Sequence, residues 1–387
     1  MDWGIAAIWL GLAVLATLLS TWVRLSVALT EILVGVLAGS LLGKDLLQTG
    51  APWVTFLAGT GSVLLTFLAG AELDPETLRR SWKEAFGIGL VGFLAPFLGA
   101  ALLAHALLGW ASQASWLAGV ALSTTSVAVV YAVMLELGLN KTPFGKVILA
   151  ACFVNDLGTV LALGLLFAPF GGRTVIFALV LLLGLLVLPP GIRRLFARYG
   201  GGTYEFEAKV LLLVLFALGA VAVWSGSEAV LPAYLVGMVL AESVGKDHGL
   251  LRRLRTLILG LLTPFYFLRA GSLVSLSALL AGFGGFLALL LAKMASKVLG
   301  VYPATLAFRY PRRDAAYTTL LMSTGLTFGT ISSLYGLSHG IINQDQYSLL
   351  VAAVIASAVV PTWIANRFFL PYHRVEEAAR LREEVEL

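Results

Sequence analysis

Charged residues are scarce in this sequence. Asp, Glu, Lys and Arg make up 12% of its 387 residues, whereas hydrophobic residues make up 59%. Soluble globular proteins carry about 25% charged residues. With a mean hydropathy of +0.94, the composition excludes an ordinary soluble protein. We therefore expect an all-α polytopic membrane protein whose surroundings are the lipid bilayer.

Cysteine and histidine are scarce as well. A single cysteine, Cys152, excludes an intrachain disulfide and a cysteine-based metal site, and the four histidines lack the spacing of metal ligands. Neither an HExxH motif nor a GxSxG motif occurs at membrane depth. We therefore expect a protein that is not an enzyme, with no catalytic residues and no cofactor.

The basic excess follows the membrane topology. The chain has 26 Lys and Arg against 21 Asp and Glu, but the basic residues lie between apolar runs rather than in a stripe with aromatics. This placement argues against a nucleic-acid partner. If the N-terminus is outside, only Lys44 and Arg173 fall on the outer side, and nearly all other Lys and Arg face the cytoplasm.

The apolar runs define the domain organisation. About thirteen runs of helix length lie between residues 3 and 370, each long enough to cross a bilayer. We expect a multi-pass protein of the cell inner (plasma) membrane, with the N-terminus outside and the C-terminus cytoplasmic. Residues 1–372 form the transmembrane domain, and residues 373–387 form a short cytoplasmic tail.

One carboxylate lies in the middle of an apolar run. Asp156, with Asn155 beside it, is near the centre of the run from Lys146 to Leu166. An ionisable residue at that depth costs at least ~2.5 kcal/mol, which makes it a candidate functional residue. The alternative is a buried acid that a structural partner neutralises.

Two other runs carry unusual clusters of small polar residues. The run 114–135 contains Thr124, Thr125 and Ser126, and the run 315–337 contains Ser323, Thr324, Gly325 and Thr327. Such clusters in corresponding positions of two halves predict helices that break around a transporter's binding site. Close helix packing through small residues is the alternative.

Two lysines lie in a later apolar run. Lys293 and Lys297 are four residues apart and share one helical face. A buried lysine needs an acid partner or a carbonyl end. We expect Lys297 to be the better candidate for the acid and Lys293 to stabilise the C-terminal end of a half-helix. Either side chain alternatively extends to the membrane surface.

These motifs together resemble a known family. Asn155-Asp156, the preceding TTSV and the later KVLG at Lys297 are similar to those of the cation/proton antiporter superfamily, which comprises bacterial Na+/H+ exchangers and Kef-type K+/H+ antiporters. The resemblance covers nearly all of residues 20–370. Three further segments agree with it: EILVGVLAGSLLG at 31–43, SVLLTFLAGAELDPETL at 62–78 and TSVAVVYAVMLELGL at 125–139.

The resemblance implies an architecture. It implies two inverted repeats with crossed discontinuous helices, and a homodimer. A dimerisation part covers approximately 1–50 and 173–250, and a core part covers approximately 52–170 and 256–370. The helix breaks fall at two sets of residues: Thr124, Thr125 and Ser126 at one, and Ser323, Thr324, Gly325 and Thr327 at the other.

The resemblance also implies roles for the site residues. Asp156 looks like the carboxylate that binds the transported monovalent cation or the proton, with Asn155, Thr125 and Ser126 around it. Asn155 stands where electrogenic members have Asp and electroneutral members have Asn. Lys297 resembles the lysine of electrogenic members, so the chain mixes both patterns. Two further departures are Thr327, where many relatives carry an acid, and Arg269, where an apolar residue is common.

We therefore expect a secondary active antiporter that exchanges Na+ or K+ for H+ by alternating access. The cation and the proton compete for Asp156, because a carboxylate holds one or the other. Electroneutral exchange is favoured, since the second carboxylate is absent. Two alternatives stay open: electrogenic 2H+/Na+ exchange that uses Lys297, and a Na+-coupled symporter of similar crossed-helix fold.

Overall fold

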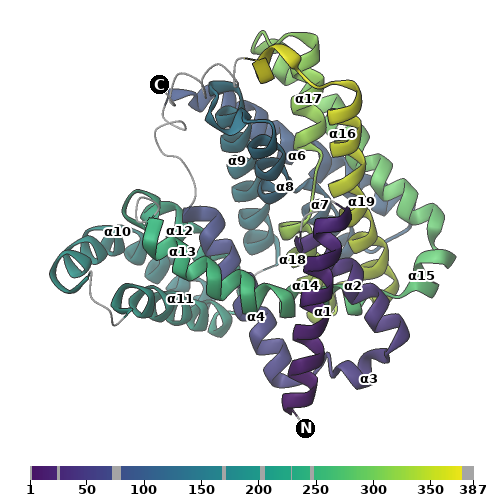
Figure 1. The fold of residues 1–387 in the computed structure, drawn as a ribbon. Helices are drawn as coiled ribbons and strands as arrows, with labels where there is room; N and C mark the ends of the chain where they lie inside the picture. Colours follow the sequence, from purple (N-terminus) through teal and green to yellow (C-terminus); the bar gives the residue numbers. More distant parts are fainter. Residues whose placement is uncertain are drawn as a thin grey trace.

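The structure is a computed structural model that describes residues 2–23, 27–71, 80–167, 171–200, 205–227, 229–244 and 248–376. Most of the expected tail, from residue 377 onward, therefore lies outside the described residues. All regular secondary structure in these ranges is helical (Figure 1). This result confirms the expected all-α class, which follows because a backbone in lipid must satisfy its hydrogen bonds internally.

The helices of the first half of the chain are α1 Asp2–Val23, α2 Val27–Leu41, α3 Gly43–Leu47, α4 Pro52–Ala71, α6 Trp82–Ala106, α7 Ser112–Ser123, α8 Val127–Glu136, η1 Leu139–Lys141 and α9 Pro143–Phe167. The helices that follow are α10 Gly172–Tyr199, α11 Phe206–Trp224, α12 Val230–Val244, α13 His248–Leu257, η2 Ile258–Leu262, α14 Thr263–Ser272, α15 Leu276–Ala281, α16 Phe283–Ala307, α17 Arg312–Met322, α18 Thr327–Ser338 and α19 Gln344–Phe368.

Many of these helices have the length and composition of membrane spans. Within the described ranges, eight helices are long and apolar enough to cross a membrane: α1, α4, α6, α9, α10, α11, α16 and α19. Two shorter apolar helices, α2 and α12, accompany them. The chain is therefore a multi-pass membrane protein.

Three further helical segments are irregular. The chain leaves the helix between α7 and α8, at Thr124–Ser126, and again between α17 and α18, at residues 323–326. Both interruptions fall within the hydroxyl- and glycine-rich clusters that predicted them. Between α13 and α14 the helix instead widens into the π-helical turn η2.

Two helix pairs approach each other so closely that only glycine fits between them. A Cβ atom on Gly271 of α14 would meet the Ile32 carbonyl of α2, and one on Gly237 of α12 would meet the Phe67 carbonyl of α4. Small residues allow such backbone contact in membrane helices. With α1, α3, α10, α11 and α13, these helices form what we call the flanking group.

The helices α6–α9, with η1, and α16–α19 form what we call the site group, whereas η2 continues α13 into α14 and is counted with the flanking group, and the short helix α15 is assigned to neither. One hydrophobic cluster lies entirely within the site group and includes Ile88, Ile148 and Leu321. A separate cluster, which includes Leu64, Leu215 and Leu240, lies entirely within the flanking group. In Figure 1 the labelled helices of the site group lie to the right of α10–α13. A third cluster joins the two groups.

The segment after α19 returns to the beginning of α17. The Arg374 Nε atom lies 3.0 Å from Asp314 Oδ2, and His373 Nε2 lies 3.3 Å from Asp314 Oδ1. The Asp314 side chain is completely buried, so it requires such partners. The contact fixes residues 373 and 374, the start of the expected tail, against the site group.

We expect Gly271→Ala to destabilise the protein. The added methyl group would force α14 away from α2, and overpacking of this kind costs typically ~1–3 kcal/mol. The midpoint of thermal unfolding in detergent should therefore fall. Gly11→Ala on α1 is the matched control, because no atom lies within 4 Å of the place that its added methyl group would take. Equal midpoints for the two variants would contradict the packing described here.

Candidate functional site

The two interrupted helices meet at their breaks. The Ser126 amide donates to the Thr324 carbonyl at 3.1 Å and lies 3.3 Å from the Thr324 hydroxyl. The Thr125 hydroxyl donates to the Met322 carbonyl at 2.8 Å. Each break therefore supplies partners for backbone groups that the other break leaves without a helical partner.

Both α7 and α17 end at this crossing, so their C-terminal carbonyls gather in the middle of the site group. The C-terminal end of a helix carries a partial negative charge. The Asn155 side-chain amide offsets part of this negative charge, because it donates a hydrogen bond to the carbonyl of Ser123, the last residue of α7, at 3.2 Å. Asn155 thereby ties α9 to the end of α7.

The two lysines of α16 supply the positive charge. The Lys293 ammonium donates to the carbonyl of Thr124, just beyond α7, at 3.1 Å. The Lys297 ammonium donates to the Thr125 hydroxyl at 2.9 Å, and that hydroxyl in turn donates to the end of α17. Both lysines are completely buried, and each half-helix end has a lysine side chain on or next to it.

Lys293 lies at a half-helix end, and its predicted role in stabilising that end stays a prediction. Lys297 lies on Thr125, and within the part of the chain that the structure describes neither lysine forms an ion pair with Asp156. The pairing of Lys297 with the acid stays a prediction. In this arrangement the hydrogen bond to Thr125, which is part of the helix crossing, holds Lys297 in place.

Gly325 leaves the space that the Lys293 ammonium occupies. A Cβ atom at position 325 would collide with Lys293 Nζ and would lie 3.0 Å from the Thr124 hydroxyl. Thr324 and Ser323 bond to their own segment, through the Leu321 and Thr319 carbonyls. The break between α17 and α18 is therefore shaped to admit a charged side chain.

Asp156 lies on α9 beside this crossing. Its side chain is 1% exposed, and its Oδ1 atom has no hydrogen-bond partner among the described residues. Within the same residues, the Oδ1 atom of the neighbouring Asn155 is also buried without a partner. Buried acceptors are rarely left unpaired. Two adjacent oxygens without donors are what a proton or a hard cation would satisfy.

Four residues near the site, Ser123, Thr159, Met322 and Tyr234, were not among the site residues predicted from the sequence. The Ser123 hydroxyl lies 3.4 Å from the Thr159 hydroxyl, and Cys152 donates to the Met322 sulfur at 3.7 Å. Tyr234 of α12 donates to the Phe153 carbonyl of α9 at 2.9 Å. Ser123 belongs to the same hydroxyl run as Thr124, which was a usable signal. No local sequence pattern distinguishes Tyr234, Thr159 or Met322.

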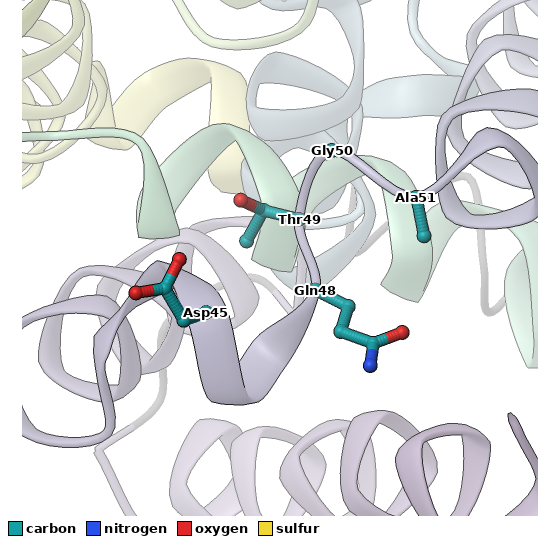
Figure 2. Close-up of a pocket in the computed structure, with 5 residues that line it drawn as sticks. All are labelled: Asp45, Gln48, Thr49, Gly50 and Ala51. Carbon is teal, nitrogen blue, oxygen red and sulfur yellow. The ribbon is translucent and has the colours of Figure 1, made fainter. Parts of the chain in front are cut away.

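Arg269 and Thr327 contribute differently. The Arg269 Nε atom donates to the Thr49 carbonyl at 2.8 Å, so this cation holds the turn before α4. Figure 2 shows a surface pocket at that turn, and none of the candidate site residues lines it. Thr327 begins α18, as its position in the cluster predicted.

A family model described as "Sodium/hydrogen exchanger, transmembrane" matches residues 10–369. The chain belongs to this family. The family consists of transporters, not enzymes, in agreement with the superfamily that the motifs indicated.

Several relatives resemble this sodium/hydrogen exchanger family member along most of its length. It is 27% identical to Cation/H(+) antiporter 18 of Arabidopsis thaliana, over 90% of this chain and 46% of the relative. It is 26% identical to Probable Na(+)/H(+) antiporter 3 of Methanocaldococcus jannaschii, over 89% of this chain and 90% of the relative. It is 25% identical to Na(+)/H(+) antiporter NhaS4 of Synechocystis sp., over 93% of this chain and 95% of the relative. The chain therefore spans about half the length of the Arabidopsis relative.

A solved structure shares the fold. The sodium proton antiporter MjNhaP1 from Methanocaldococcus jannaschii, determined at pH 8, superposes with a TM-score of 0.70 at 16% sequence identity. The match covers 96% of this chain and 99% of that chain. This chain therefore shares the fold of that structure.

We expect Gly325→Ala to displace the Lys293 ammonium from the Thr124 carbonyl. A hydrogen bond that involves a charged group contributes ~1.5–3 kcal/mol, so the midpoint of thermal unfolding should fall by several degrees. Gly284→Ala on α16 is the control, because its surroundings are open. Wild-type stability of Gly325→Ala would show that the Lys293 contact does not support the crossing.

Proposed function

We propose that this protein exchanges a monovalent cation, Na+ or K+, for H+ at Asp156. The observation that carries the proposal is the buried, unpaired Oδ1 atom of Asp156 beside the crossing of two interrupted helices. Membership of the sodium/hydrogen exchanger family supports it. The printed names of the relatives, which are cation/H(+) and Na(+)/H(+) antiporters, agree with it.

The exchange follows from the chemistry of one carboxylate. In its ionised form Asp156 binds the cation, and in its protonated form it cannot. Hard cations take several oxygen ligands. The Asn155 Oδ1 atom and the hydroxyl groups at the crossing, with water, are the available donors. A bound proton or a bound cation neutralises the Asp156 carboxylate. Without either, the negative charge would make it energetically costly to move the site past the dry part of the protein.

The lysines keep the binding site intact while Asp156 changes its ligand. Lys293 and Lys297 stabilise the half-helix ends through hydrogen bonds to the Thr124 carbonyl and the Thr125 hydroxyl. Because the protonated and the cation-loaded forms of Asp156 carry equal charge, one H+ moves for each cation. We therefore propose electroneutral exchange. Electrogenic exchange is the second candidate, since Lys297 would add a second proton if it released one.

Alternating access requires two parts that move relative to each other. We propose that the site group moves against the flanking group, because each has its own hydrophobic cluster. The backbone contacts of α4 with α12 and of α14 with α2 support assigning α4 and α14 to the flanking group. This proposal departs from the division that the family resemblance implies, which placed α4 and α14 in the core part at approximately 52–170 and 256–370.

The finer architecture belongs to the same proposal. The eight long helices, the two short ones and three composite segments (α7–α8, α13–α14 and α17–α18) give thirteen crossings. The pairing of α2 with α14 corresponds to that of α12 with α4, which supports two inverted repeats. The side preference of Lys and Arg supports an external N-terminus and a cytoplasmic C-terminus in the plasma membrane. We propose a homodimer through the flanking group.

We expect Asp156→Asn to abolish exchange. In proteoliposomes with a pH-sensitive dye inside, wild-type protein should move H+ when Na+, K+ or Li+ is added, and the variant should not. The exposed Asp345 of α19 supplies the control, because Asp345→Asn removes an acid far along the chain from the site. Exchange by Asp156→Asn at the wild-type rate would overturn the site assignment. A rate that never saturates would favour a channel.

We also expect the wild-type exchange rate to be independent of an imposed membrane potential, since no net charge moves. Lys297→Gln should remain insensitive to the potential even where its rate falls. If the wild-type rate follows the potential and Lys297→Gln loses this response, the electrogenic alternative is correct. Cation uptake that requires an organic co-substrate would instead favour the symporter.

A further inference from the structure

Tyr234 joins the flanking group to the helix that carries Asp156. It lies on α12 and is completely buried. Its phenol donates to the Phe153 carbonyl at 2.9 Å, three residues before Asp156 on α9. The bond thus reaches across the boundary between the two groups at the level of the site.

The ring of Tyr234 also contacts the second interrupted helix. Its centroid lies 5.7 Å from that of Phe328, with an interplanar angle of 87°. This edge-to-face geometry is a favourable aromatic contact. Phe328 is the second residue of α18, so one side chain touches both helices that shape the site.

The helix that carries Tyr234 is held firmly. A Cβ atom on Gly70 of α4 would meet the carbonyl of Tyr234 itself, and one on Gly237 would meet that of Phe67. Close backbone packing on both sides leaves α12 little freedom to slide along α4. When the site group moves, α12 therefore stays with α4, and the bond to Phe153 must break.

When the Tyr234–Phe153 bond breaks, the Phe153 carbonyl still has a hydrogen-bond partner. In an α-helix each carbonyl accepts the amide four residues further on. The Phe153 carbonyl therefore keeps the Leu157 amide when the phenol departs. The hydrogen bond from Tyr234 consequently stabilises one orientation of the site group and is dispensable for the helix itself.

We propose that Tyr234 is a positioning residue that holds α9 and α18 in the orientation described here, and so sets the balance between the two access states. This inference rests on the proposed function. A neutral hydrogen bond changes an equilibrium by roughly two- to tenfold. Loss of the phenol hydroxyl should shift the two populations by that factor in favour of the opposite state.

The test compares the two faces of the membrane. In proteoliposomes with uniformly oriented protein, the half-saturating cation concentration is measured from each face for wild type and Tyr234→Phe. The ratio of the two values depends on the balance between access states. We expect the ratio to change by roughly two- to tenfold. A general structural defect would alter both faces alike and leave the ratio unchanged.

Tyr317→Phe is the matched control. Tyr317 is equally buried, and its hydroxyl donates to Asn366 Oδ1 at 3.2 Å, within the site group. Its loss should leave the ratio unaltered, because the bond moves with the group. An unchanged ratio in Tyr234→Phe, or an equal change in Tyr317→Phe, would overturn the inference.

A second readout does not depend on transport. Leu231 of α12 packs against Gly164 of α9, so its side chain lies at the boundary between the two groups. A cysteine in place of Leu231, in a Cys152→Ser background, should be alkylated by N-ethylmaleimide faster when the described orientation is weakened. We expect a roughly two- to tenfold increase in Tyr234→Phe and none in Tyr317→Phe. If wild-type protein exchanges no ions, the proposed function fails, and the alkylation rates alone decide the role of Tyr234.

Discussion

The crossing of two interrupted helices is the constraint on which the site depends. Breaking a helix inside a membrane exposes backbone groups that no water can satisfy. Here Thr125 and Ser126 satisfy groups of the α17–α18 segment, while Asn155 and Lys293 satisfy the end of α7. Most of the polar side chains at the centre of the site group therefore form hydrogen bonds that stabilise the interrupted helices. Among the described residues, the Oδ1 atoms of Asp156 and Asn155 are two adjacent buried oxygens beside the crossing that have no hydrogen-bond partner.

The sequence predicted the parts of this arrangement that depend on local chemistry. A carboxylate within an apolar run made Asp156 the candidate residue, and its role stays a prediction. The helix interruptions fall within the clusters of hydroxyl and glycine residues. The apolar runs predicted the membrane helices, because burial in lipid requires long uninterrupted hydrophobic segments. These features are readable since each is caused by residues that are neighbours in the chain.

Features that depend on distant residues were not predictable in the same way. The contact of Lys297 with Thr125 joins residues 172 positions apart, and that of Tyr234 with Phe153 joins residues 81 apart. Burial explained why both lysines need partners, but it did not select Thr125 over Asp156. The close approach of α2 to α14 likewise follows from two glycine-containing surfaces that only the folded chain brings together.

The ion pair between Asp314 and Arg374 has a consequence for the order of assembly. The two residues are separated by 60 positions, and the segment between them contains α17, α18 and α19. Ribosomes deliver a chain from its N-terminus onward, so the carboxylate emerges well before the guanidinium that will neutralise it. The start of α17 therefore cannot reach its final, desolvated environment until α19 has been synthesised.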